Sequence, residues 1–200
     1  TAGTASATDK NGGEVTIEYS ANNGATWTTD PTTIKATNVA DSVTVQVRAS
    51  GANYTGYVIG TQELTITKRT VTLTSETATK PYDGKALTRP TVAVSGDGFV
   101  TGEVSGITAT GSVTYVTDGP NHDGVVENTI EYTKNDSFVE DNYTITERPG
   151  TLTITKRTDV IVITTPTRAR AYNGKLLRDG ACDYTGTLAE GDELIITFAT

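Results

Sequence analysis

The heptamer LTITKRT occupies Leu64–Thr70 and returns unchanged at Leu152–Thr158. The two copies begin 88 residues apart (64 to 152), and seven identical residues at the spacing of a small domain indicate a tandem repeat. Leucine and isoleucine alternate with threonine, which is the period of a strand with one buried and one solvated face. We therefore predict that the heptamer is the closing strand of a β-module and that the next module follows at once.

The composition supports strands throughout. Hydrophobic residues make up 35 % of the 200 residues, threonine is the commonest residue, and methionine is absent. β-Branched threonine suits a pleated, half-buried surface better than a helix. We predict an all-β fold of small tandem modules, each sandwich-like with an immunoglobulin-like or β-grasp-like strand order.

Charge and cysteine content exclude several classes of protein. The net charge of −8 and the sequence pI of about 4.6 argue against nucleic acids and anionic membrane surfaces, which attract basic patches. No apolar run approaches the roughly 18 residues that a membrane span needs. Cys182 is the one cysteine, so an intramolecular disulfide is excluded. Disulfide-free β-modules are common among bacterial surface proteins, which suits this composition.

Three modules are expected along the chain. Residues 1–70 form a module without an opening strand, residues 71–158 form the complete repeat, and residues 159–200 are the opening half of another. Strands are predicted around these segments: Val15–Tyr19, Val43–Arg48, Val71–Thr74, Val92–Val94, Val113–Tyr115, Val126–Tyr132, Tyr143–Ile145 and Leu152–Ile154. Since no Pro/Gly/Ser-rich linker separates the modules, we expect them to be held semi-rigidly in a rod.

A four-residue turn motif recurs with the repeat. Tyr-Asp-Gly-Lys in the second module becomes Tyr-Asn-Gly-Lys in the third; the residues are Tyr82, Asp83, Gly84, Lys85 and Tyr172, Asn173, Gly174, Lys175. A recognition loop is one interpretation. A structural turn is favoured, because Asp and Asn both bond their own backbone and glycine supplies a positive φ, while the charge is not kept.

These motifs together resemble the YDG/MBG-type tandem repeats of bacterial cell-surface proteins and adhesins. The quoted order is Thr-Leu-Thr-Ser, Lys-Pro-Tyr-Asp-Gly-Lys, Gly-Phe-Val-Thr-Gly-Glu, Asn-Tyr-Thr-Ile-Thr and Gly-Thr-Leu-Thr-Ile-Thr within residues 71–158. Residues 1–70 resemble the companion repeat, with its Gly-x-Thr-Trp turn and Val-x-Val-Arg-Ala strand. The resemblance implies an extracellular, non-catalytic stalk or adhesin segment, and it brings no catalytic residues or cofactor.

Few side chains suggest site chemistry. Asp118, Asn121, Asp123 and Glu127 offer oxygens to calcium, but their spacing does not fit an EF-hand, so a solvated hairpin loop is favoured. His122 lies in the same loop, yet no nucleophile motif accompanies it. Cys182 is interpreted as a small buried hydrophobe rather than a reactive thiol. Intramolecular Lys–Asn or Thr–Gln crosslinks stay open, because they need a buried carboxylate that sequence does not show.

The function expected from these patterns is a structural repeat segment, such as a stalk, spacer or filament subunit, without enzymatic activity. The alternative is a module that binds glycan or a host glycoprotein. Sugars stack on exposed aromatic rings, so the spacer predicts that four aromatic side chains are mostly packed: Trp27, Tyr57, Tyr115 and Tyr132.

The two ends are complementary halves of a module. The chain begins at Thr1 rather than Met, so an excised piece of a longer array is expected. Alternatively, residues 159–200 of one copy complete residues 1–70 of the next by strand addition, which would make a head-to-tail fibre. The expected partners are thus neighbouring repeats of the same chain or other copies.

Overall fold

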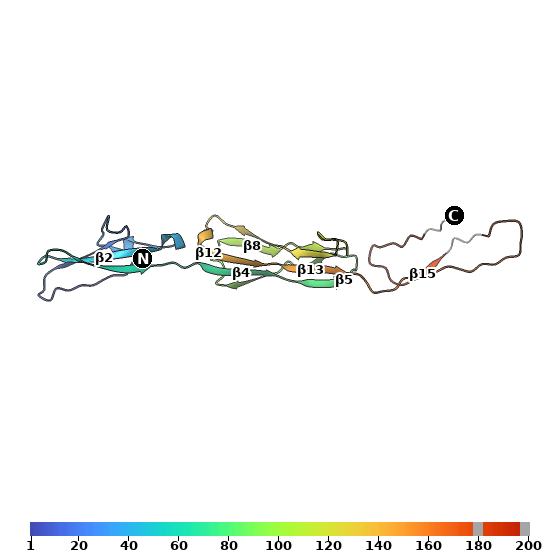
Figure 1. Ribbon diagram of the computed structural model, residues 1–200, viewed down its shortest axis with the longest axis horizontal. Coiled ribbons are helices and arrows are strands. Elements are labelled where there is room, and N and C mark those ends of the chain that lie inside the picture. The colour runs from blue at the N-terminus through green and yellow to red at the C-terminus, as the bar shows by residue number, and fades with distance from the viewer. Residues whose placement is uncertain (178–181, 197–200) are drawn as a thin grey trace. The chain divides into compact units, whose positions relative to one another are not determined.

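A computed structural model describes residues 1–177 and 182–196, and within them the chain is all-β (Figure 1). About 40 % of the chain lies in strands, and the helical part consists of three short 3-10 turns, η1 (Pro31–Thr33), η2 (Val39–Asp41) and η3 (Glu140–Asn142). The all-β prediction is confirmed.

Contacts group the chain into two compact units. The first unit comprises Thr1–Thr72, Val94–Ser105 and Lys134–Thr146, and the second comprises Leu73–Ala93, Gly106–Thr133 and Glu147–Thr200. The division into modules at residues 70 and 158 stays a prediction.

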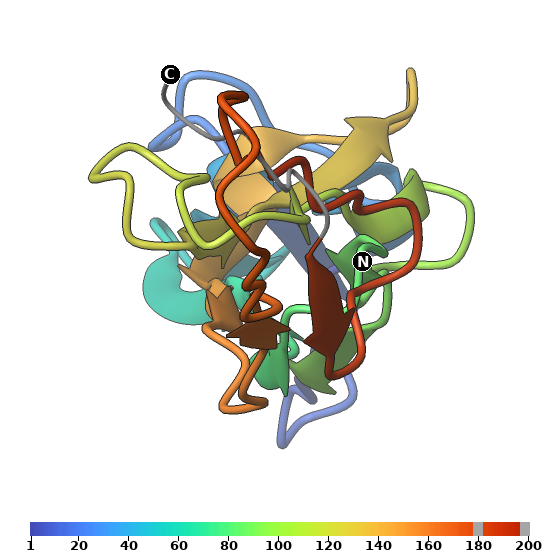
Figure 2. The same ribbon diagram turned by 90° about the vertical axis from the view of Figure 1, so that its right-hand side faces the viewer.

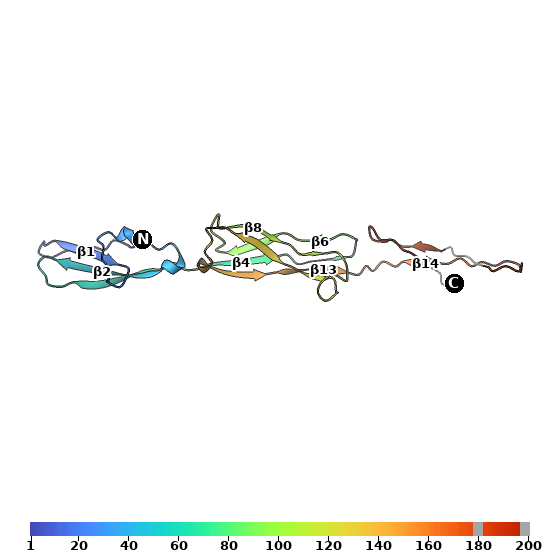
Figure 3. The same cartoon turned by 90° about the horizontal axis from the view of Figure 1, so that it is seen from above.

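The first unit contains a three-stranded antiparallel meander of β1 (Val15–Ser20), β2 (Val43–Gly51) and β3 (Val58–Leu64) (Figure 3). Val15 lies opposite Gly51, and Val43 lies opposite Leu64. Residues directly opposite share a face, so this register gathers most apolar residues of the three strands on one side of the sheet, while Ile59 lies opposite Arg48 on the other side. Tyr19 and Val45 are the most deeply buried of them, and Ala2 and Ile34 pack against that face.

The second unit contains a three-stranded sheet of β10 (Val125–Asn128), β13 (Gly150–Thr155) and β5 (Ala78–Pro81). The central strand β13 is antiparallel to β10 and parallel to β5. A short antiparallel pair, β6 (Leu87–Thr88) and β9 (Ser112–Val113), covers the sheet through a core of Leu87, Val113, Leu152 and Ile154. The result is sandwich-like: apolar residues alternate along each strand and meet in one thin core.

Asn128 is a fully buried polar residue at the end of β10. Its Oδ1 accepts a hydrogen bond from the N–H of Gly111 at 3.1 Å, and its Nδ2 donates to the carbonyls of Glu76 (3.1 Å) and Arg89 (2.8 Å). Its own carbonyl accepts the Ser75 hydroxyl at 2.6 Å. The side chain of Asn128 thus provides hydrogen bonds to backbone groups of three separate segments and links those segments within the sandwich.

The remaining strands of the described residues form one three-stranded sheet and two two-stranded sheets. Their order is β12-β4-β7, β11-β8 and β14-β15, with bounds β4 (Arg69–Ser75), β7 (Val92–Gly96), β8 (Val104–Ala109), β11 (Ile130–Lys134), β12 (Tyr143–Arg148), β14 (Val162–Thr164) and β15 (Asp183–Thr185). β14 and β15 form an antiparallel pair in the C-terminal part of the chain (Figure 2). All residues of the two strands are exposed.

The two heptamer copies do not have the same structure, which corrects the prediction that each is a closing strand. The second copy lies within β13 from Leu152 to Thr155 and is paired on both sides. In the first copy, β3 ends at Leu64 and β4 begins at Arg69. Ile66 is instead bonded to a side chain, because its N–H donates to the Ser42 hydroxyl at 3.0 Å. Strand partners, not the seven residues, decide which copy becomes a strand.

Two other predicted strands differ from the structure. The segment Val126–Tyr132 is broken at Thr129 into β10 and β11, and the strand at Val113–Tyr115 stops at Val113. The second difference has a local cause, since the N–H groups of Thr114 and Tyr115 both donate to the carboxylate of Asp118 and are lost to the ladder.

Candidate functional sites

The calcium-candidate loop uses its carboxylates to shape the backbone. Asp118 Oδ2 accepts two N–H groups at 2.8 Å, from Tyr115 and Thr114, and these bonds lower the pKa of Asp118. Asp123 Oδ1 accepts the N–H of Val125 at 3.1 Å, while Asn121 and Glu127 are exposed. Within residues 1–177 and 182–196, no three His, Cys, Asp or Glu side chains gather as metal ligands would.

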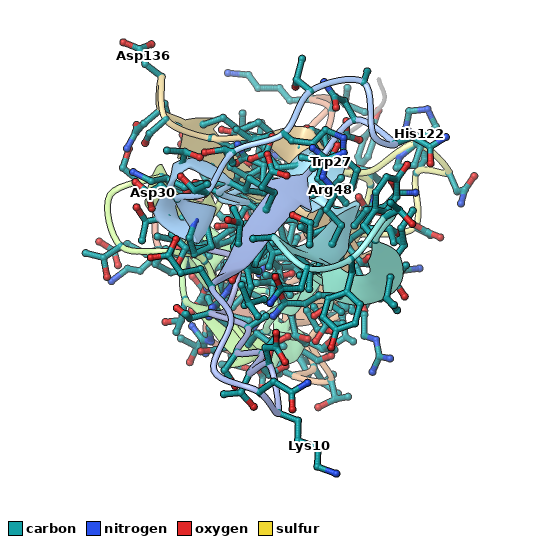
Figure 4. The ribbon with its side chains drawn as sticks, turned by 90° about the vertical axis from the view of Figure 1, so that its left-hand side faces the viewer. Lys10, Trp27, Asp30, Arg48, His122 and Asp136 are labelled. Atoms are coloured by element: carbon teal, nitrogen blue, oxygen red, sulfur yellow. The ribbon has the colours of Figure 1, made fainter. Side chains whose placement is uncertain are left out.

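The other two chemistry candidates are also placed by the structure. His122 lies in the loop with a positive φ of 54°, and its Nδ1 lies 3.1 Å from the carbonyl oxygen of Thr117. Its ring projects outward (Figure 4). Cys182 is half-buried beside the start of β15.

The prediction that the four aromatic side chains are packed is wrong for two of them. Tyr57 is 55 % exposed and Tyr115 is 53 % exposed, whereas Trp27 and Tyr132 are partly buried. Both exposed rings lie in loops, outside the strands of either unit. Tyr57 belongs to the first unit and Tyr115 to the second.

An aromatic and cationic cluster lies on the solvent side of the first sheet. The Cζ of Arg48 is 4.1 Å from the ring centre of Trp27 and 5.2 Å from that of Tyr57. Figure 4 shows Arg48 beside Trp27. The guanidinium also forms an ion pair with Glu18, which lies directly opposite in the β1–β2 register, at 2.7 Å. A cation is attracted to the faces of nearby aromatic rings, so Arg48 links Trp27 and Tyr57 on this face of the sheet.

A groove of about 560 Å³ opens between the N-terminal segment and the β2–β3 loop of the first unit. Tyr54, which is 61 % exposed, lies in its wall together with Tyr57. Asp9 lies opposite them on the N-terminal segment, and the Tyr54 hydroxyl donates to Asp9 at 3.4 Å. The side chain of the neighbouring Lys10 projects away into solvent (Figure 4). Two rings next to a carboxylate form a polar, aromatic-lined surface.

The first recurring turn has the geometry expected of Asp-Gly. Asp83 Oδ1 accepts the N–H of Lys85 at 2.9 Å, and Gly84 has a φ of 84°. Lys80 Nζ donates to the carbonyl of Lys85 at 2.7 Å and closes the turn. Tyr82 packs its ring against the core of the second unit, with its centre 5.9 Å from that of Tyr115.

This first turn is docked on a segment of the next predicted module. The Tyr82 hydroxyl donates to Asp192 Oδ1 at 2.8 Å, and Lys85 Nζ lies 2.7 Å from Glu190 Oε2. The hydrogen bond to Asp192 is the main reason that the pKa of Tyr82 is raised. A Cβ added to Gly84 would lie 2.2 Å from the carbonyl oxygen of Glu190, so only glycine permits the contact. We call these contacts the turn joint.

The turn joint was missed by reasoning from the sequence. The signal for it lay in the repeat, because Leu188, Gly191 and Asp192 align with Phe99, Gly102 and Glu103. Asn128 gave no such signal, since asparagine in a strand pattern does not reveal which backbone groups it will meet.

No family model matches this chain, and no curated protein or solved structure is similar enough to count as a match. The resemblance to YDG/MBG-type repeats therefore stays a prediction from the motifs. No helix among the described residues is long and apolar enough to cross a membrane.

Proposed function

We propose that this chain is a structural repeat segment of a bacterial extracellular surface protein, acting as a stalk, spacer or filament subunit rather than as an enzyme. The observation that carries the proposal is the turn joint, in which the Tyr82–Lys85 turn of one repeat binds the Glu190–Asp192 segment of the next. Direct contact between successive repeats without a flexible linker is how solenoid and rod proteins transmit stiffness along the chain.

A second contact of the same kind lies within the first unit. Asn142 Oδ1 accepts the N–H of Val39 at 2.8 Å, and its Nδ2 donates to Asn38 Oδ1 at 2.8 Å. These residues lie about 100 positions apart (39 to 142) in two predicted modules. Specific hydrogen bonds between modules limit how freely one can rotate against another, which supports a spacer that keeps its length.

Small-angle X-ray scattering of the full chain tests the spacer proposal. A compact 200-residue protein has a radius of gyration of about 16 Å. Modules arranged in a row must exceed that value clearly, and the distance distribution should have the long tail of an extended particle. A radius of gyration near that of a compact protein would contradict the proposal.

The surface location is tested separately by treating intact bacteria with a thiol reagent that does not cross membranes. Labelling of Cys182 supports a surface location, and labelling only after the cells are broken contradicts it.

A second candidate function is glycan binding, which the exposed Tyr54 and Tyr57 favour. Rings that line a groove beside Asp9 present both a stacking surface and a hydrogen-bonding group to a sugar. A glycan array probed with the parent chain and with Tyr54→Ala tests this function. Binding that the variant loses supports it, whereas equal signals from the two proteins contradict it.

A further inference from the structure

The second recurring turn has the same internal geometry as the first. Asn173 Oδ1 accepts the N–H of Lys175 at 3.1 Å, as Asp83 accepts that of Lys85 at 2.9 Å. Gly174 has a φ of 75°, and the guanidinium of Arg170 donates to the carbonyl of Lys175. The turn at Tyr172–Lys175 is therefore formed without a docked segment from residues 1–177 or 182–196.

The two turns differ in what covers them. Tyr172 is 98 % exposed, whereas Tyr82 is partly buried and bonded to Asp192. Among the described residues, no heavy atom lies within 4 Å of a Cβ built on Gly174, while the equivalent position on Gly84 is filled by the backbone of Glu190. The second turn thus presents the docking surface of the turn joint in an open state.

The segment that fills the first joint also has an equivalent elsewhere in the chain. Ala189–Asp192 is a β-turn, in which the N–H of Asp192 donates to the carbonyl of Ala189 at 3.1 Å and Gly191 has a φ of 86°. Val100–Glu103 is the same turn, with an N–H to carbonyl distance of 3.1 Å and a φ of 88° at Gly102. Each turn ends in a carboxylate, Asp192 or Glu103.

The Val100–Glu103 turn is open on the side that the joint would use. Val100 and Thr101 are exposed, and among the described residues no heavy atom lies within 4 Å of a Cβ built on Gly102. Glu103 Oε2 accepts the Tyr143 hydroxyl at 2.5 Å, which fixes the carboxylate and leaves lone pairs on both oxygens for another donor.

We propose that the Tyr172–Lys175 turn of one copy of this chain binds the Val100–Glu103 turn of a second copy, in the arrangement that Tyr82–Lys85 and Ala189–Asp192 show within one chain. The Tyr172 hydroxyl donates to the carboxylate of Glu103, and the backbone at Thr101 lies against Gly174. The inference rests on the proposed repeat architecture. The two surfaces are different, so the contact is head-to-tail and does not close on itself.

One difference between the two joints makes the proposal testable. Lys85 faces Glu190 in the joint within the chain, but Lys175 would face Thr101, which carries no charge. Within one chain, the two segments of the joint are tethered and therefore meet at a high effective concentration. Separate copies lack this tether, so we expect the same small contact between copies to have a low affinity. Thr101→Glu restores the missing carboxylate and should strengthen it.

The experiment is zero-length carbodiimide crosslinking of the full-length Thr101→Glu protein, followed by peptide mass spectrometry. We expect a crosslinked dimer in which Lys175 of one copy is joined to position 101 of the other. The matched control is Thr67→Glu, which adds the same charge to an exposed loop position of the first heptamer. Adding Tyr172→Ala or Lys175→Gln to Thr101→Glu should abolish this crosslink, and neither removes a packed side chain.

The outcomes separate this inference from the proposed function. A dimer yield no higher than that of Thr67→Glu, or a crosslink between other positions that survives Tyr172→Ala, overturns the docking proposal. Scattering from a dilute sample of the same protein measures the single chain. An extended particle without the crosslink would leave the spacer function standing and remove only the contact between copies.

Discussion

At the scale of the residue, Asn128 does most to define the sandwich of the second unit. A Cβ on its neighbour Gly111 would lie 2.7 Å from the Cα of Asn128, so the two backbones already touch. Replacing a buried amide that bonds three backbone groups is costly. Each of those groups would stay buried without a hydrogen bond, and its desolvation would no longer be compensated.

We expect Asn128→Leu to lower the free energy of unfolding by roughly 3 kcal/mol or more, because it leaves one N–H and two carbonyls without their partner. Urea denaturation of the full chain measures the change. Asn121→Leu is the control, since Asn121 is exposed in a loop and surface substitutions cost about 0.5 kcal/mol or less. Equal effects of the two substitutions would show that the buried amide is not a special anchor.

The carboxylate of Asp118 makes a second residue-scale prediction. The N–H groups of Tyr115 and Thr114 lower its pKa in the folded chain below the ordinary value of 3.8. A lowered folded-state pKa contributes stability above the unfolded pKa, and that stability is lost as the pH falls through the folded one. Asp118→Asn should therefore have a lower melting temperature than the parent at pH 7, with the difference shrinking below about pH 4. A difference that stays constant with pH contradicts the assignment.

At the scale of the element, the repeated heptamer provides a matched pair of sites with one sequence and two structures. Ile154 is buried in β13 between two partner strands, whereas Ile66 is partly buried outside any strand. The difference lies in what surrounds each copy, so identical substitutions measure the contribution of the surroundings directly.

Ile154→Ala should reduce the free energy of unfolding by about 2–5 kcal/mol, the usual cost of a cavity in a packed core. Ile66→Ala should cost less than half as much, because less apolar surface is removed from water there. Guanidinium denaturation of both variants, monitored by circular dichroism, checks the ranking. A larger loss of stability for Ile66→Ala than for Ile154→Ala would contradict this expectation.

For the whole molecule, the relevant difference between the predicted modules is how many apolar residues each one buries. Residues 71–158 include the buried residues Leu87, Val113, Leu152 and Ile154, while β14 and β15 have no buried residue. Conformational entropy is overcome only where apolar surface is buried, so the two parts should differ as isolated fragments.

We expect the fragment 71–158 to unfold cooperatively and the fragment 159–200 to show no thermal transition. Differential scanning calorimetry of the two purified fragments measures both. Adding an excess of 71–158 to 159–200 also tests whether the turn joint orders the shorter piece. A cooperative transition of 159–200 alone would refute the expectation.

The all-β class of the fold and the recurrence of the motifs could both be read from local patterns in the sequence. Alternating Val, Ile and Thr residues allow one buried face per strand, and the recurring heptamer and Tyr-x-Gly-Lys turns locate equivalent positions, because these signals are local and survive without knowledge of partners. Turn chemistry was local as well, since Asp83 and Asn173 bond an N–H only two residues away.

The tertiary structure was needed to see which equivalent segments adopt different structures. Two identical heptamers differ because one lies between β10 and β5, and two similar turns differ because one meets Glu190 and Asp192. The exposure of Tyr57 and Tyr115 and the bonds of Asn128 depend in the same way on residues far along the chain. Pairing, burial and docking are properties of neighbours in space, and a repeated sequence does not state which neighbours each copy will have.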